Sequence, residues 1–186
     1  MEPRVRSFKL ILILLFFVFF LIFVLLQFLA PLYLPSGSVD DLSGLVGVYD
    51  NEETIINIPS PWNSVYSIGD RMCHQIADRS FFINGNQMPF CARCTGIFLG
   101  VTIGFFLMIF LKIQLDKKFI YLIILGILPI GVDGLGQLID LWESTNLTRV
   151  LTGLLIGIIT GIAIVIIIDE LEELIKRKSR TKSKYL

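Results

Sequence analysis

Charged residues, histidine and cysteine are all scarce in this chain. Of its 186 residues, 17% are charged, one is histidine and three are cysteine, whereas 54% are hydrophobic and 15 are phenylalanine. So little charge excludes an ordinary soluble domain and indicates a membrane protein, and the length suits one domain. The odd number of cysteines argues against a purely structural set of disulfides.

Long stretches without charge predict four membrane-spanning helices. The first has Gln27 as its only polar residue between Leu10 and Leu29, and about 20 apolar residues are enough to cross the hydrocarbon core. No small-residue cleavage site follows it, so we interpret it as a retained helix rather than a secretory signal. We expect the spanning helices at residues 10–32, 93–111, 119–141 and 150–168.

The distribution of cations predicts the orientation in the cell membrane. With a cytoplasmic N-terminus, twelve of the sixteen lysine and arginine residues lie inside, as the positive-inside rule requires. Residues 1–9, 112–118 and 169–186, the last forming a basic tail, are then cytoplasmic, and residues 33–92 and 142–149 are extracytoplasmic. The predicted fold is an all-α integral-membrane four-helix bundle with both termini inside and an outer loop region folded over the helix mouth.

Two of the predicted helices share the pattern T-G-x3-G-x3-G. It runs from Thr95 to Gly104 and again from Thr152 to Gly161. Tandem GxxxG spacing places glycines on one helix face and lets backbones approach closely. The pattern predicts that the two helices pack side by side, or that they join copies of the chain in a homo-oligomer. The alternative is the ordinary glycine richness of membrane helices.

All the cysteines and the histidine lie in CHQIADRSFFINGNQMPFCARCTG, residues 73–96. Cys73, His74, Cys91 and Cys94 make a Cys3His set, which is a complete tetrahedral shell for zinc. Adjacent side chains diverge, however, so His74 is either the fourth ligand or a base beside an open catalytic position. The motif does not fit covalent attachment of c-type haem, because Thr95, and not histidine, follows Cys94.

The same CxxC spacing also fits a thiol–quinone oxidoreductase. Arg93 and a helix N-terminus would lower the pKa of a thiol there. Enzymes that pass electrons from thiols to a quinone usually need a second cysteine pair, and only Cys73 remains. A third alternative is a non-catalytic protein, such as a metal sensor, transporter subunit or scaffold.

Polar residues of the third and fourth helices should meet the cysteine cluster at the outer side. Asp133 and Gln137 are one helical turn apart, and an ionisable residue inside a membrane segment is a functional candidate. Asp133 can serve as a general base, a metal ligand or the counter-ion of Arg149. The four outer cations are all arginine, which suits anion binding as well as pairing with acids. These cations are Arg71, Arg79, Arg93 and Arg149.

With CHQIADRSFFINGNQMPFCARCTG beside DGLGQ and STNLTRVLTG, the chain resembles a family of small prokaryotic multi-pass membrane proteins known only as a domain of unknown function. The resemblance covers about residues 69–161 and implies no activity. The positions that it singles out are Cys73, His74, Gln75, Arg79, Ser80, Gln87, Cys91, Arg93, Cys94, Thr95, Asp133, Gln137, Asn146 and Arg149.

The leading hypothesis is a zinc-dependent membrane hydrolase or transferase. Its expected substrate is an anionic lipid or polyprenyl phosphate, and we expect membrane lipid but no nucleic acid as a partner; a quinone replaces zinc if the redox alternative holds. The expected metal ligands are Cys73, His74, Cys91 and Cys94, the catalytic residues Asp133, His74 and Arg149, and the substrate-binding residues Arg79, Arg93, Gln137, Asn146, Gln87 and Thr95.

Overall fold

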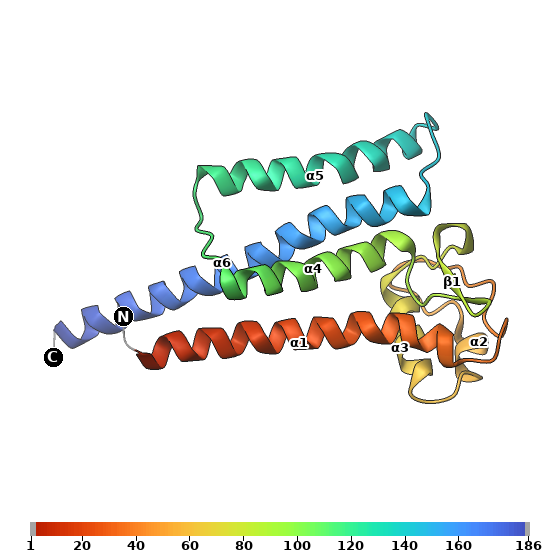
Figure 1. The fold of residues 1–186 in the computed structure, drawn as a ribbon, viewed down its shortest axis with the longest axis horizontal. Coiled ribbons are helices and arrows are strands. Elements are labelled where there is room, and N and C mark those ends of the chain that lie inside the picture. Colours follow the sequence, from red (N-terminus) through yellow and green to blue (C-terminus); the bar gives the residue numbers. More distant parts are fainter. Residues whose placement is uncertain (1–2, 185–186) are drawn as a thin grey trace.

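Four long helices run along the molecule in the computed structural model, which describes residues 3–184 and the side chains of residues 9–175 (Figure 1). They are α1 (Pro3–Tyr33), α4 (Ala92–Phe110), α5 (Lys117–Leu138) and α6 (Asn146–Lys184). Each contains a stretch long and apolar enough to span a membrane, namely Lys9–Tyr33, Ala92–Phe110, Lys117–Leu138 and Asn146–Ile175. The predicted four-helix membrane fold is confirmed.

The ends of α5 and the start of α6 are set by local hydrogen bonds and differ by a few residues from the expected spans. Asp116 caps α5, because its carboxylate accepts a hydrogen bond from the backbone N–H of Phe119. At the other end α5 stops at Leu138, and Asp140 has a left-handed φ of 54°. Helix α6 begins at Asn146, four residues before the expected span at residue 150. Thr145 precedes it, and its hydroxyl accepts a hydrogen bond from the N–H of Thr148 in the first turn.

The glycine pattern packs α4 directly against α6. A Cβ on Gly96, Gly100 or Gly104 would lie 2.5, 2.3 or 2.5 Å from a carbonyl oxygen of α6. The α6 glycines meet α4 carbonyls in the same way, at 2.2–2.6 Å. Only glycine allows backbones this close. The two glycine faces therefore cover each other within one chain, and the homo-oligomer contact expected through them stays a prediction.

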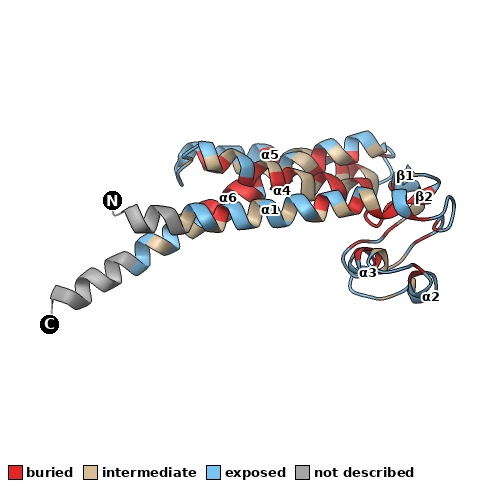
Figure 2. Cartoon of the chain, turned by 60° about the horizontal axis from the view of Figure 1, so that its bottom comes forward, coloured by how far each residue is buried: buried red, intermediate tan, exposed pale blue. Residues whose placement is uncertain are grey.

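The other two helices attach through side chains. Phenylalanines of α1 stack on α4, with the ring centroids of Phe16 and Phe105 5.5 Å apart. Helix α5 packs mainly on α6 and leaves residues such as Leu125 and Leu128 exposed, on a surface suited to lipid. Figure 2 shows that buried residues gather where α1, α4 and α6 meet.

The segment between α1 and α4 covers one end of the bundle, which we call the loop end. It contains α2 (Glu52–Ile56), α3 (Trp62–Met72), a short 3-10 helix (Ala77–Arg79) and strands β1 (Phe82–Ile83) and β2 (Asn86–Gln87). The strands form an antiparallel hairpin around Asn84 and Gly85, both with positive φ, as a two-residue Asn-Gly turn requires. The fold is all-α apart from this hairpin.

Buried polar groups tie this cap together and to α1. The Asn86 amide donates to the carbonyl of Pro31 at 2.9 Å and accepts from the N–H of Val39 at 3.0 Å. The Tyr66 hydroxyl donates to the Gln87 carbonyl at 2.7 Å, and burial raises the pKa of Tyr66. These contacts hold the cap in one position over the helix ends.

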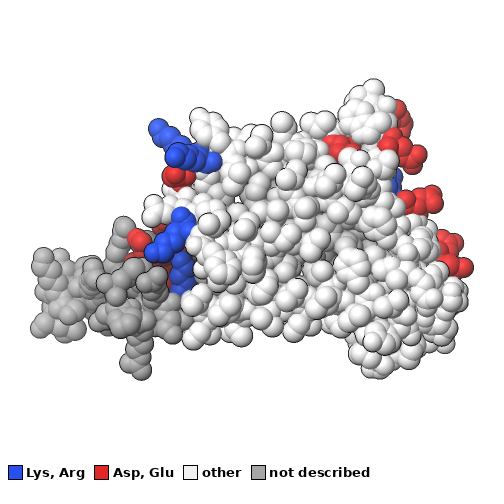
Figure 3. All heavy atoms as spheres, in the orientation of Figure 1, with Lys and Arg blue, Asp and Glu red and all other residues white. Residues whose placement is uncertain are grey.

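Charge separates between the two ends of the bundle (Figure 3). Acidic side chains gather at the loop end, whereas lysines lie near the opposite end, together with a few acidic side chains such as Asp169. This separation agrees with the predicted orientation, which stays a prediction. The cations at Arg4 and Arg6, and those of the predicted tail beyond residue 175, lie outside the described side chains.

Candidate metal centre and adjoining polar pocket

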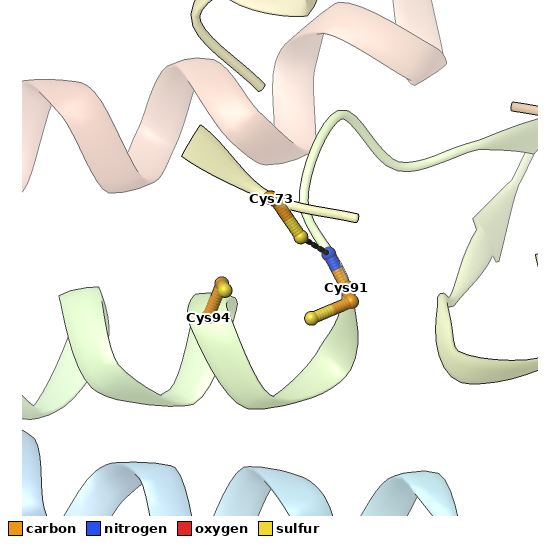
Figure 4. A group of neighbouring side chains, drawn as sticks. All are labelled: Cys73, Cys91 and Cys94. Carbon is orange, nitrogen blue, oxygen red and sulfur yellow. Dashed lines mark hydrogen bonds between the residues drawn. The ribbon is translucent and has the colours of Figure 1, made fainter. Parts of the chain in front are cut away.

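The three cysteines meet at the loop end (Figure 4). Cys73 directly follows α3, Cys91 caps the N-terminus of α4, and Cys94 lies in the first turn of that helix. Their sulfur atoms all lie within 4.8 Å of one another. Tetrahedral zinc with Zn–S bonds of about 2.3 Å holds its sulfurs roughly 3.8 Å apart. A small contraction would therefore bring three thiolates onto one ion.

Backbone contacts fix Cys73 against the start of α4. Its sulfur accepts hydrogen bonds from the N–H groups of Cys91 at 3.3 Å and Gln75 at 3.5 Å. The segment before Cys91 passes close over α3, because a Cβ on Gly69 would lie 2.0 Å from the carbonyl oxygen of Pro89. The buried Gln75 amide donates to the same oxygen at 2.8 Å. The cluster is thus built by the cap as much as by α4.

The thiols also shift each other's acidity. Hydrogen bonds from the thiols of Cys73 and Cys94 lower the pKa of Cys91 to about 2. The hydrogen bond to Cys91, together with burial, raises the pKa of Cys73 to about 11. Cys91 is therefore the most acidic of the three thiols, and a bound cation would displace their protons.

His74 lies outside this group of sulfurs, and its side chain is exposed. Cys73 has an extended backbone, in which successive side chains point to opposite sides. In the described structure the expected Cys3His set is a cluster of three thiols. The role of His74 as a fourth ligand or a base stays a prediction.

Arg93, between the two cysteines of the CxxC motif, reaches across to α5. Its guanidinium pairs with the buried carboxylate of Asp133. Asp133 also accepts hydrogen bonds from the Ser144 hydroxyl and, at 3.1 Å, from the Gln137 amide. The close ion pair of Asp133 is thus with Arg93, while its charge also acts on Arg149, so that the counter-ion role toward Arg149 stays a prediction. Because both carboxylate oxygens are engaged, Asp133 is better placed to orient Arg93 than to accept a proton.

Arg149 is buried at the start of α6 and joins the same network. It donates to the Gln137 side chain at 3.2 Å and to the Asn146 side chain at 3.1 Å. Asn146 in turn donates to the backbone carbonyl of Ser80 in the cap at 3.1 Å. The predicted convergence of α5, α6 and the cap at one polar pocket is thus present in the structure.

An open hollow of about 280 Å³ lies beside this network. Arg149 is close enough to Arg79 and Arg93 to experience the positive charge of both. Within residues 9–175, only Arg93 among these arginines has a carboxylate within 4.0 Å, and its Nε has no hydrogen-bond partner. The hollow therefore carries unbalanced positive charge. It is lined by Arg79, Arg93, Gly134, Gln137 and Leu138.

Two predicted substrate-binding residues lie elsewhere. The Gln87 side chain is buried in the cap, where it bonds to the backbone of Leu42. The Thr95 hydroxyl donates to the carbonyl of Phe90 at 3.4 Å, at the start of α4. Conversely, Ser144 was not predicted as a site residue. Its hydroxyl donates a hydrogen bond to Asp133, and no local sequence motif indicates this contact.

Comparison with known proteins places the site in a family. The family model described as "Predicted membrane protein (DUF2085)" matches residues 73–164. An uncharacterized protein of Methanothermobacter thermautotrophicus is 36% identical over 93 residues, which make up 50% of this chain and 82% of that protein. The chain belongs to the DUF2085 family. This confirms the family resemblance expected from the motifs.

The DUF2085 match begins at Cys73 and includes all three thiols, Arg93, Asp133 and Arg149. An uncharacterized protein of Methanocaldococcus jannaschii is 42% identical over 95 residues, covering 50% of this chain and 61% of that relative. The aligned segment thus spans less than two thirds of that protein. No solved structure matches the chain.

Proposed function

We propose that this DUF2085 protein is a metal-dependent hydrolase or transferase that acts on an anionic lipid, such as a polyprenyl phosphate. The observation that carries the proposal is the position of Arg93. It lies between two cysteines of the thiol cluster and pairs with the buried Asp133 of the polar pocket. A metal centre and an anion site would therefore share one wall.

Three thiols favour zinc, which binds sulfur at tetrahedral sites. Three protein ligands leave one position open, as in catalytic rather than structural zinc sites. A bound ion would act there as a Lewis acid toward a phosphate oxygen or a water molecule.

The chain's own residues would bind and orient the substrate. Arg79 and Arg93 face the hollow and can donate forked hydrogen bonds to phosphate oxygens. Asp133 would hold the Arg93 guanidinium in place, and Gln137 would do the same for Arg149. In hydrolysis, water adds to the phosphorus, the bond from phosphorus to the leaving oxygen breaks, and the proton from water goes to that oxygen.

The hollow suits a lipid because it opens beside membrane-facing residues. Leu138 lines it and is 78% exposed, as is fitting for contact with an acyl or isoprenyl chain. The positive-inside rule would place the site on the extracytoplasmic side. A phosphate head group could then enter from the outer leaflet while its apolar chain stays in the membrane.

The first test measures zinc and free thiols in detergent-purified, unreduced protein. We expect about one zinc ion per chain, as three thiolates can hold. Cys91→Ser should remove it, whereas His74→Ala should leave it in place because His74 is exposed and outside the sulfur group. A loss of zinc in His74→Ala equal to that in Cys91→Ser would instead support the Cys3His set.

The activity is tested by release of inorganic phosphate from a polyprenyl phosphate in mixed micelles. Arg79→Ala should raise KM by about tenfold to a hundredfold, since it removes a charge-assisted contact. Arg71→Ala is the matched control, because Arg71 stacks on the Tyr49 ring in the cap and does not line the hollow. Phosphate release no faster than that of Cys91→Ser would overturn the proposal.

A thiol–quinone oxidoreductase is the second candidate, favoured by the lowered pKa of Cys91. In that reaction the Cys91 and Cys94 thiols lose two protons and two electrons as a bond forms between their sulfurs, and a quinone takes up both to become a quinol. Zinc-free protein with one free thiol per chain would support this candidate. Full metal occupancy without any turnover would instead indicate a sensor, transporter subunit or scaffold.

A further inference from the structure

Gln27 is the one polar residue in the apolar run of α1, and its amide has no partner. The side chain is fully buried, at 0% exposure, and neither Nε2 nor Oε1 makes a hydrogen bond. Burying an amide without hydrogen bonds costs several kcal/mol, on the order of 2–7. A polar group kept at this cost inside a membrane helix is a candidate for binding a ligand.

Helical spacing places Gln27 level with Cys94. The rings of Phe23 on α1 and Phe98 on α4 are in contact, with centroids 4.9 Å apart. Gln27 lies four residues after Phe23, and Cys94 lies four residues before Phe98. Because α1 and α4 run in opposite directions, both steps lead about 6 Å toward the loop end, on the two helix faces that meet (Figure 1).

Contacts on either side enclose the same level. Phe23 also touches the ring of Phe90, the residue before Cys91, at a centroid distance of 5.5 Å. One turn beyond Gln27, the carbonyl of Pro31 accepts a hydrogen bond from the cap residue Asn86. Figure 4 shows Cys73 between the ribbons of α1 and α4. The amide of Gln27 is closed off from solvent, and helical spacing sets it at the level of the thiol cluster.

We infer that Gln27 belongs to the metal centre and serves its fourth coordination position. This inference rests on the metal centre proposed above. Three thiolates leave that position open, and His74 is exposed. An amide suits the place because its oxygen can accept a hydrogen bond from a water molecule bound there, so that the position stays exchangeable for substrate. Its N–H can at the same time donate to a thiolate and offset the negative charge of the sulfurs.

The test is a Co²⁺ titration of the full-length protein in detergent, with wild type, Gln27→Leu and a control. Gln27→Leu should weaken Co²⁺ binding by about 10–100-fold, as loss of a ligand-supporting group typically does. The sulfur-to-cobalt charge-transfer band should keep its intensity, since three thiolates remain, while the d–d bands shift. Without metal, Gln27→Leu should unfold at the same or a higher temperature, because an unpaired buried amide is gone.

Thr102→Val is the control, since Thr102 is buried on α4 and already donates to the carbonyl of Phe98 at 2.9 Å. It should leave the affinity and the spectrum unchanged. Gln27→Glu keeps an oxygen at the same reach but loses the N–H, so its Co²⁺ affinity should lie between those of wild type and Gln27→Leu. This second variant also tests the inference if Gln27→Leu does not fold.

The outcomes separate this inference from the proposed function. If wild type binds no Co²⁺, both are overturned. If wild type binds Co²⁺ and Gln27→Leu has the same affinity and the same d–d bands, the metal centre stands and the role of Gln27 is overturned. A loss of affinity in Gln27→Glu equal to that in Gln27→Leu also contradicts the inference, because the oxygen was kept.

Discussion

Helices α4 and α5 both pack on α6, but they do so in opposite ways. Between α4 and α6 the backbones meet through two rows of glycines, with no room for a single Cβ. On α5, a Cβ at Gly131 or Gly134 would meet nothing within 4 Å. At Gly126 it would clash only with the flexible end of Ile159, and the backbone oxygen of Leu155 would lie at an ordinary contact distance of 3.8 Å. Helix α4, which follows Cys91 and contains Cys94, is thus held to α6 by close backbone packing. Helix α5, which contains Asp133, has no such backbone contact at these glycines.

This difference gives the polar pocket one firm wall and one adjustable wall. Arg93 and Arg149 project from the firm pair, α4 and α6. Asp133 and Gln137 project from α5 and are held by hydrogen bonds and an ion pair rather than by close packing. A metal centre needs fixed ligands, whereas a lipid site needs an opening, and the two kinds of packing supply both.

The largest loss of folding stability is expected from a substitution where the backbones of α4 and α6 are closest. Gly100→Val should prevent α4 and α6 from packing, because its Cβ alone would lie 2.3 Å from the carbonyl oxygen of Leu154 and 2.8 Å from the nitrogen of Ile158. Backbone atoms cannot move aside cheaply, so overpacking here should exceed the usual cost of about 1–3 kcal/mol. We expect loss of monodisperse protein in size-exclusion chromatography and loss of the cooperative thermal transition.

The same substitution on the loose helix is the control. Gly131→Val should fold and elute as wild type, because nothing lies within 4 Å of its Cβ. If Gly131→Val is as damaging as Gly100→Val, the contrast between the two helices is wrong. If Gly100→Val folds with an unchanged transition, the close approach of α4 and α6 is wrong.

A smaller loss of stability is expected from breaking the ion pair between Arg93 and Asp133. Asp133→Asn leaves Arg93 without its carboxylate, and breaking a buried ion pair costs about 3–5 kcal/mol. Because the Arg93 side chain is 28% exposed, we expect about 1–3 kcal/mol, measured by thermal unfolding in detergent. Zinc content should not change, since no thiol contacts Asp133 among the described interactions.

Asp140→Asn is the matched control for that measurement. Asp140 is exposed beyond the end of α5, and asparagine tolerates its left-handed backbone. Its unfolding temperature should match that of wild type. Loss of zinc in Asp133→Asn would mean that the carboxylate acts on the metal centre itself, and would revive the interpretation of Asp133 as a metal ligand.

Most of the fold was predictable because its determinants are local or periodic. Apolar runs fixed the number of helices, and the repeated T-G-x3-G-x3-G pattern predicted the contact between α4 and α6. The hairpin was missed although its turn, Asn84-Gly85, is a strong local signal. The start of α6 at Asn146, ahead of the expected span, depends on one capping hydroxyl, that of Thr145, which apolar length does not encode.

The site was predictable in its members but not in its pairings. The spacing predicted that Cys73, Cys91 and Cys94 come together. It could not show that His74 is exposed and lies outside their group. The choice between Arg93 and Arg149 as the partner of Asp133 depends on how α5 leans on α6, which no motif encodes. Gln27 stood out as a lone polar residue, but its burial and its level along α4 follow only from the packing of α1 on α4.

The smallest effect is expected at the opposite end, where α6 meets its third neighbour, α1. Lys9 donates to Asp169 at 2.6 Å, and both side chains are about 30% exposed. A partly solvated pair of this kind contributes less than about 1 kcal/mol and is screened by salt. Lys9→Met should therefore lower the unfolding temperature slightly at low ionic strength and not at all in concentrated salt. A difference that persists in concentrated salt would show a desolvated contact, and α1 would then belong with α4 as a firm partner of α6.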